Sequence, residues 1–146
     1  MTSDMIAFCG LYCGACSLKL AADECDKDHL MRMPQKYDYL KMKPLEFCPG
    51  CRLENQCGQC SIRDCAMEKG IDYCSLCDEF PCETLVKFNN DGIPHHGAAI
   101  ENLNKLVDMG AESWVASQVK EWTCGCGAKY SWYKKNCGKC NGGSQK

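Results

Sequence analysis

Hydrophobic residues recur at helical spacing in several parts of this chain, and the clearest case is the stretch Ala98–Met109. Its apolar positions are Ile100, Leu103, Leu106 and Val107. A spacing of three and four residues places such side chains on one face of an α-helix. Gly110 follows directly, and glycine commonly ends a helix. We therefore predict an amphipathic helix over residues 98–109.

Three further stretches show the same period. Ser17–Met33 predicts a helix that Pro34 ends, because proline cannot continue the backbone hydrogen bonding. Ser113–Trp122 predicts a shorter helix, and another begins after Cys82. The apolar positions of these last two helices are Trp114, Val115 and Val119, and Leu85, Val86 and Phe88, respectively. We expect a polar connection from Gln35 to Glu46 and a loop over residues 89–97, with the sequence NNDGIPHHG.

The pattern changes after residue 121, where glycine, lysine and aromatic residues replace the helical period. Within this tail, the segment Lys129–Tyr133 alternates between polar and aromatic residues, and this pattern suits a short hairpin strand. We expect two domains: a cysteine-rich helical metal-binding domain over residues 1–121 and a zinc-ribbon-like module over residues 122–146. The predicted fold class is small and mostly α with minor β, stabilised by metal.

Composition explains why metal enters this prediction. The chain has 146 residues and 16 cysteines, so its apolar fraction of 45 % overstates the groups available for a core. A chain this short with a thin core needs another source of stability. The N-terminus has no basic region followed by an apolar stretch of signal length, and no apolar run approaches a membrane span. We therefore expect a cytoplasmic protein with reduced thiols that bind metal, rather than a disulfide framework.

The charge is uneven along the chain. Residues 120–146 contain six lysines and one glutamate, a balance of +5, whereas the whole chain has a formal charge of −2. The charge of the main domain does not indicate nucleic-acid binding; only the basic tail has a charge that suits it.

Fifteen of the cysteines lie in close groups, and we take these as the candidate metal ligands. They are Cys9, Cys13, Cys16, Cys48, Cys51, Cys57, Cys60, Cys65, Cys74, Cys77, Cys82, Cys124, Cys126, Cys137 and Cys140. Pairs separated by two residues let both sulfurs reach one ion, as structural zinc requires. Four thiolates complete a site, so the number of cysteines predicts three to four zinc ions.

The middle group supplies eight of these thiolates and contains a short internal echo. Cys-x2-Cys-x4-Cys occurs at residues 57, 60 and 65 and again at 74, 77 and 82. Two similar loop-and-helix units would each present three thiolates. Iron–sulfur clusters also take four thiolates, although the usual C-x2-C-x2-C-x3-C-P run is absent. Zinc is favoured, with an iron–sulfur cluster as the alternative.

The first group, Cys9-x3-Cys13-x2-Cys16, has the spacing that radical-SAM enzymes use to hold a cluster. That chemistry needs a large α/β barrel, which a chain of this length without βα alternation does not build. We expect a further structural site, completed by Cys25, by His95 or His96, or by a cysteine from elsewhere. A histidine pair in a polar loop is more often a surface or capping feature than a ligand pair.

The tail carries the most specific pattern. Cys124-x-Cys126 and Cys137-x2-Cys140 lie ten residues apart and can surround one ion, and the glycines between them allow tight turns. Its aromatic residues are interleaved with lysines, which is typical of surfaces that stack nucleic-acid bases. We favour the simpler interpretation, in which the rings cover the ribbon's own core and pack it onto the helices.

No arrangement typical of catalysis accompanies the cysteines. Asp78, Glu79 and Glu83 are acidic residues at a helix start, where they complement the helix dipole. No glycine-rich phosphate loop or serine elbow is present. We expect a binding module rather than an enzyme, although an open metal position on an enzyme is compatible with the sequence.

Several of these motifs together resemble a known family. They are CGLYCGAC, CPGC, CSIRDCAMEKGIDYCSLCDEFPCETL and NLNKLVDMG followed by a tryptophan. The chain resembles the cysteine-rich domain of unknown function 3795 over about residues 5–120. The resemblance implies metal binding, an intracellular setting and an anaerobic host, and it implies no activity. Cys25 and the ribbon lie outside its pattern.

The sequence thus predicts a zinc-binding protein whose structural sites each hold one ion with four cysteines, and which acts as a binding or scaffold module. The alternative is an iron–sulfur protein for electron transfer or redox sensing. The sequence does not identify the partner: a protein is one candidate, nucleic acid at the ribbon is not favoured, and no membrane is expected.

Overall fold

A computed structural model of the chain describes residues 5–45, 51–52 and 60–135. The chain forms two compact units, and neither is continuous in sequence. Unit 1 comprises Met1–Cys13 and Gly50–Val115, and unit 2 comprises Gly14–Pro49 and Ala116–Lys146. The predicted boundary between two domains, at residues 121 and 122, is not tested by this division and stays a prediction.

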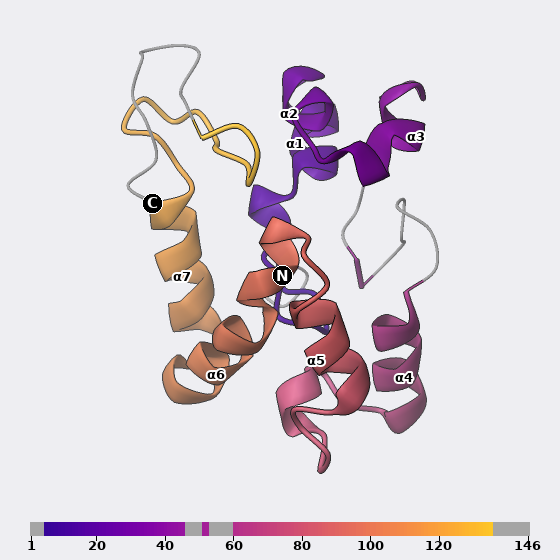
Figure 1. The fold of residues 1–146 in the computed structure, drawn as a ribbon. Helices are drawn as coiled ribbons and strands as arrows, with labels where there is room; N and C mark the ends of the chain where they lie inside the picture. Colours follow the sequence, from indigo (N-terminus) through magenta and orange to yellow (C-terminus); the bar gives the residue numbers. More distant parts are fainter. Residues whose placement is uncertain (1–4, 46–50, 53–59, 136–146) are drawn as a thin grey trace. The chain divides into compact units, whose positions relative to one another are not determined.

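Most of the described chain is helical (Figure 1). Unit 1 contains α4 (Ser61–Lys69), η4 (Cys74–Leu76), α5 (Glu83–Asn89), η5 (Pro94–Ala98) and α6 (Ala99–Met109). Unit 2 contains α1 (Ser17–Asp23), α2 (Asp28–Met31), η3 (Gln35–Tyr37) and α3 (Asp38–Lys41). The short helix η2 (Cys13–Ala15) and helix α7 (Ala111–Glu121) each begin in unit 1 and end in unit 2. The predicted mostly helical class is confirmed.

Extended structure is sparse. In the described residues it consists of isolated antiparallel bridges that join Ile6 to Tyr12, Thr123 to Lys129, and Ser131 to Lys134. The predicted strand over Lys129–Tyr133 is therefore reduced to single bridges. In the same residues, no helix is long and apolar enough to span a membrane.

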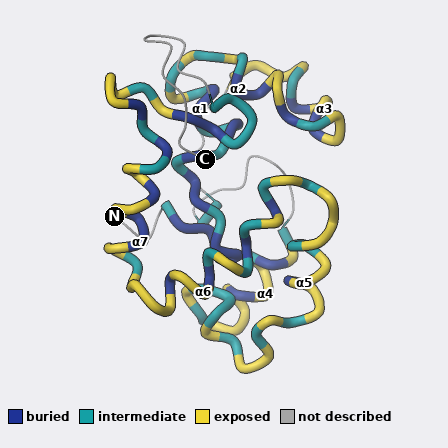
Figure 2. The backbone as a smooth tube through the Cα atoms, turned by 60° about the vertical axis from the view of Figure 1, so that its left-hand side comes forward, coloured by how far each residue is buried: buried dark blue, intermediate teal, exposed yellow. Residues whose placement is uncertain are grey.

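Helix α6 follows the predicted periodicity closely. It ends at Gly110, whose φ of +82° is a conformation that side chains other than glycine rarely adopt. Ala99, Leu103 and Leu106 are buried at helical spacing, and the residues between them are half-buried or exposed. Figure 2 shows this alternation of burial along α6. The prediction is wrong for Val107, which is 63 % exposed.

The predicted helix over Ser17–Met33 is wrong as a single element. Helix α1 ends in a Schellman motif: Asp26 N donates to Ala21 O and Cys25 N donates to Ala22 O. Cys25 stands at the position that glycine usually occupies there, with a φ of +51°. The carboxylate of Asp26 then accepts a hydrogen bond from Asp28 N at 3.1 Å, where α2 starts. Cys25 consequently lies exposed between two short helices and not within an apolar stripe.

The connection after Pro34 is more structured than its polar composition suggests. Helices η3 and α3 lie within the stretch that we expected to be irregular. Tyr37 and Leu40 are buried in unit 2, so two apolar side chains suffice to fold this segment onto its neighbours.

The core of unit 1 forms around its N-terminal segment. Tyr12 packs edge-to-face against Trp114, with ring centroids 6.1 Å apart. Gly10 lies directly against α6: a Cβ at this position would stand 2.8 Å from the Leu103 side chain. Asn102 donates a hydrogen bond to Gly10 O at 3.0 Å. These contacts hold the residues next to Cys9 in a fixed conformation.

Candidate metal centre

The predicted ligands are distributed over both units. Unit 1 contains Cys9, Cys13, Cys51, Cys60, Cys65, Cys74, Cys77 and Cys82, and unit 2 contains Cys16, Cys124 and Cys126. The predicted ligands Cys48, Cys57, Cys137 and Cys140 lie outside the described residues.

Four cysteines of unit 1 line one groove of about 500 Å³. Cys65 comes from the middle of α4, Cys74 starts η4, Cys77 follows η4, and Cys82 is the N-cap residue of α5. The apolar part of the lining is Ile62, Ala66, Ile71, Phe80 and Leu85. The groove therefore combines four soft sulfur donors with a largely apolar wall.

The cysteine spacing that residues 57–65 and 74–82 share is not accompanied by the same secondary structure. Cys65 lies within a helix, whereas Cys82 precedes one. The expectation of two similar loop-and-helix units is therefore wrong for the residues that the structure describes. The groove instead joins the last cysteine of the first motif to all three cysteines of the second.

Electrostatic coupling among these thiols shows how close they lie. Burial raises the pKa of Cys74 to about 11, and negative charge on Cys82, Cys65, Cys77 and Cys60 raises it further. The Cys74 thiol therefore keeps its proton near neutral pH and is a weak nucleophile. It loses this proton when a cation offsets the repulsion.

Lys69 places a positive charge at the edge of the groove. Its Nζ donates to Cys77 Sγ at 3.2 Å and to Glu79 Oε2 at 3.0 Å. The carboxylate of Glu79, and after it the Cys77 sulfur, hold the pKa of Lys69 above its ordinary value. Lys69 is a site residue that the sequence analysis missed, because only the fold of α4 against the segment after η4 reveals it.

The other cysteines of unit 1 lie nearer the N-terminal segment. Cys9 and Cys13 are buried. Burial raises the pKa of Cys9 to about 12; a backbone hydrogen bond at Leu11 opposes this, and charge on Cys60, Cys74 and Cys13 adds to it. Cys9 therefore lies within electrostatic reach of cysteines from three other positions of unit 1.

These thiols do not surround an ion as they stand. In residues 5–45, 51–52 and 60–135, no group of three or more Cys, His, Asp or Glu side chains is arranged so that it could hold a metal ion. The donor chemistry of the groove fits a thiolate-bound metal, but its sulfurs would have to converge further to bind one.

The histidine pair is engaged locally. His96 Nδ1 lies 2.7 Å from Asp91 Oδ2, and the His96 ring stacks on Phe88 with centroids 3.8 Å apart. Asp91 also accepts a hydrogen bond from Ile93 N. His95 packs edge-on against His96. The pair thus lies in η5, where His96 contacts Phe88 of α5 and Asp91 of the turn between the two helices, and it is not part of the lining of the groove.

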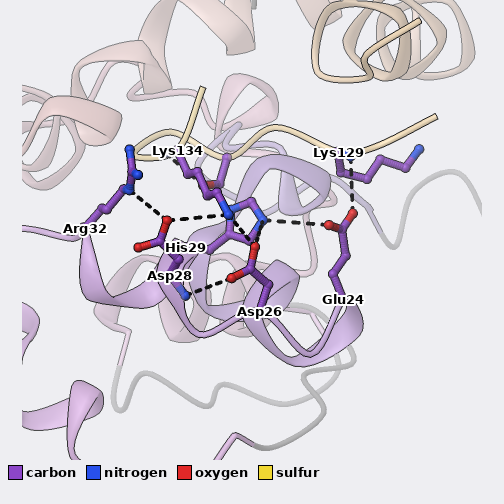
Figure 3. A network of polar contacts seen from close by, with 8 residues as sticks. Glu24, Asp26, Asp28, His29, Arg32, Lys129 and Lys134 are labelled. Carbon is purple, nitrogen blue, oxygen red and sulfur yellow. Dashed lines mark hydrogen bonds and ion pairs between the residues drawn. The ribbon is translucent and has the colours of Figure 1, made fainter. Parts of the chain in front are cut away.

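In unit 2 the ribbon residues pack with α1 and α2. Trp132 N donates to Ala15 O at 3.1 Å, and the Trp122 and Trp132 rings lie 5.5 Å apart with Lys135 over both. Figure 3 shows the polar part of this packing, in which Lys134 pairs with Asp26 and Lys129 N donates to Glu24. The acidic turn between α1 and α2 thus meets the lysine-rich tail, and this complementary charge is the signal that the sequence analysis did not use.

The loop of the predicted ribbon forms a tight turn at its first cysteine pair. Gly127 N donates to Cys124 O, and Cys124 N donates to Ala128 O, each at 2.8 Å. Gly127 has a φ of +95°, which explains the glycine at this position. The second pair, Cys137 and Cys140, lies outside the described residues, so metal binding by the ribbon stays a prediction.

Comparison with known proteins identifies a family. The family model described as a protein of unknown function, DUF3795, matches residues 5–87. The matched segment contains all the cysteines from Cys9 to Cys82, and it ends well before residue 120, where we had expected the resemblance to end. No curated protein and no solved structure matches the chain.

Proposed function

This chain belongs to the DUF3795 family, whose description assigns no activity, and from its site we propose that the protein binds zinc through cysteine thiolates. The observation that supports this function best is the groove that Cys65, Cys74, Cys77 and Cys82 line together. Four thiolates are the complete ligand set of a structural zinc ion.

The surroundings of the groove suit a bound thiolate group. Lys69 donates to the sulfur of Cys77, and a donor of this kind offsets the excess negative charge that four thiolates leave on a dication. Cys82 occupies the N-cap of α5, where free backbone N–H groups favour a negatively charged sulfur. A zinc ion would draw the four sulfurs together and release their protons.

We further propose that the protein acts as a binding or scaffold module with several such ions, and not as an enzyme. Four protein ligands leave no open position for a substrate on the metal. A short, cysteine-rich chain has few large apolar groups for its core, so the ions would contribute a large part of the folding free energy. Structural zinc sites contribute about 10–16 kcal/mol of apparent binding free energy.

A second candidate is an iron–sulfur protein, because the four cysteines that line the groove are also the complete ligand set of a cluster. Its role would be electron transfer or redox sensing.

Metal analysis of the full chain, purified without oxygen, tests both candidates. We expect three to four zinc ions per chain and a colourless protein. A brown protein with stoichiometric iron and sulfide would replace zinc by the cluster. A folded chain that contains neither metal, and gains none when zinc is added, would contradict both.

A further inference from the structure

The N-terminal segment of unit 1 presents two buried cysteines on a tight loop. Ala7 N donates to Leu11 O and Gly10 N donates to Ala7 O, each at 2.9 Å, and a bridge joins Ile6 to Tyr12. Cys9 lies at the tip of this loop, and Cys13 follows it. Both side chains are more than nine-tenths buried. The loop therefore offers two thiols in fixed positions.

Arg52 fastens a second cysteine-bearing segment to this loop. Its Nε donates to Ile6 O at 2.5 Å, and its guanidinium group lies 4.2 Å from the centroid of the Phe8 ring. Arg52 directly follows Cys51, and Phe8 directly precedes Cys9. The cation thus ties the backbone at Cys51 to the backbone at Cys9.

The same arginine reaches a third segment. Its guanidinium group lies 4.8 Å from the centroid of the Tyr73 ring and donates to Asp72 O. The neighbouring residue, Cys74, donates its backbone N–H to Phe8 O at 2.9 Å. Arg52 is always charged, and its guanidinium group lies over two rings while it donates to two carbonyls. A clamp of this kind brings the loop to the edge of the groove.

Cys60 completes the arrangement from the start of α4. It is the N-cap residue of this helix, and its Sγ accepts a hydrogen bond from Arg63 N at 3.5 Å. Charge on Cys60 acts on Cys9 more strongly than charge on any other cysteine does in the described part of unit 1. Cys65, later in the same helix, lines the groove, and Cys60 does not. Cys60 and Cys65 belong to one sequence motif, but Cys60 acts on the thiol of Cys9, whereas Cys65 lies with the thiols of the groove.

We propose that unit 1 holds a second metal site, in which Cys9, Cys13, Cys60 and Cys51 bind one thiolate-seeking dication such as Zn²⁺. The inference extends the proposed function to a site distinct from the groove. It divides the motif at residues 57–65: Cys60 serves the buried site, and Cys65 serves the groove. Arg52 is a positioning residue that holds the Cys51 segment against the loop. The loss of four thiol protons accompanies binding of the ion.

The division of the motif gives a test by metal counting. We would purify full-length variants without oxygen and measure zinc per chain. If Cys9 and Cys60 share an ion, Cys9→Ser with Cys60→Ser loses one equivalent, the same as either substitution alone. If Cys60 and Cys65 serve different ions, Cys60→Ser with Cys65→Ser loses two equivalents. Cys25→Ser is the matched control, because Cys25 is exposed in unit 2 and should lose none.

The reverse pattern overturns the inference. One equivalent lost by the Cys60 and Cys65 pair, with two lost by the Cys9 and Cys60 pair, would mean that the motif serves a single ion. The proposed function would survive that result, because the wild-type chain would still contain its metal. A wild-type chain without metal would instead overturn the proposed function itself.

A measurement on the wild-type chain covers the case in which the variants do not fold. In ¹H–¹¹³Cd correlation spectra of the cadmium-loaded protein, each cadmium couples to the β-protons of its own cysteine ligands. We expect one cadmium to correlate with Cys9, Cys13, Cys51 and Cys60, and another with Cys65, Cys74, Cys77 and Cys82. A cadmium that correlates with both Cys60 and Cys65 would contradict the division.

Discussion

His29 and Ser131, which lie 102 residues apart in the sequence, join the helical and ribbon parts of unit 2 through a contact of 2.7 Å between Nδ1 and Oγ. Both residues are almost fully buried. The other ring nitrogen of His29 faces Glu24 at 3.8 Å and Asp26 at 3.9 Å. This one side chain therefore links the turn after α1 to the ribbon.

This position makes the stability of unit 2 depend on pH. Burial lowers the pKa of His29 below its ordinary value of 6.5; Asp26, Glu24 and Asp28 oppose this shift, and Lys134 adds to it. The unfolded chain then takes up a proton more readily than the folded chain. The contribution of His29 to the free energy of unfolding should be constant above pH 6.5 and should fall as the pH drops below that value.

Urea unfolding at pH 7.5 and pH 5.5, followed by near-ultraviolet circular dichroism, checks this expectation. His29→Gln should lose less stability than the wild-type chain over the same interval. Protonation of thiolates affects both chains alike, so the difference between them isolates His29. Equal losses would show that the imidazole does not contribute to the pH dependence.

Lys134 is the second connection between the ribbon and the helices. It pairs with Asp26 and, at 3.5 Å, with Asp28, and the bond to Lys134 lowers the pKa of Asp26. In Lys134→Glu three carboxylates would share this site. We expect a loss of about 2 kcal/mol in the stability of unit 2.

Thermal melting monitored by tryptophan fluorescence measures this effect, since the Trp122 and Trp132 rings lie 5.5 Å apart in the same unit. The control is Lys36→Glu, an exposed lysine of unit 2 away from the acidic turn. If Lys134→Glu and Lys36→Glu melt alike, the ion pairs of Lys134 do not stabilise the ribbon.

Gly10 and Gly92 form a matched pair that separates packing from backbone strain. Both have a φ of +89°, but only Gly10 has neighbours within 4 Å of the position where a Cβ would stand. Gly92→Ala should cost about 1 kcal/mol, the penalty of the left-handed conformation alone. Gly10→Ala adds a clash with Leu103 and Ala99 O, and overpacking of this kind costs about 1–3 kcal/mol more.

Denaturant unfolding of the two variants provides the comparison. The Gly10 substitution should also lower the metal content if the loop next to Cys9 carries a ligand, whereas the Gly92 substitution should not. Equal destabilisation would mean that the loop moves away from α6 without penalty.

Local features of the fold could be predicted from the sequence, and features set by distant segments could not. Helix α6 and its end at Gly110 follow from periodicity and one glycine. The break after α1 does not, because Cys25 adopts a conformation that sequence rules assign to glycine. The hydrogen bonds of Asp26 and its pairing with Lys134 stabilise a turn there.

In the candidate site, too, local features could be predicted from the sequence and contacts between distant segments could not. The spacing of the cysteines indicated thiolate chemistry, since ligand pairs are encoded locally. It could not indicate that Cys65 lies with Cys74, Cys77 and Cys82, because the path of the chain decides which pairs meet. Lys69 and Arg52 were missed for the same reason: each acts on residues that come close only in the folded chain.

Lys69 offers a test of the groove that leaves every proposed ligand in place. Its Nζ donates to Cys77 Sγ at 3.2 Å, so Lys69→Met removes a positive charge and a hydrogen bond from the thiolate that would bind the ion. Partners of metal ligands typically contribute about 10–100-fold to metal affinity. Because Lys69 is exposed, we expect a loss of about tenfold, at the lower end of that range.

Competition for zinc with a chromophoric chelator measures this affinity in the full chain. Lys105→Met is the matched control, because Lys105 is an exposed lysine of unit 1 that pairs with Glu101 at 2.9 Å. Lys69→Arg keeps the charge and should recover most of the affinity. If Lys69→Met and Lys105→Met bind zinc equally well, the ion is not bound at Cys77, and the groove is not the metal site.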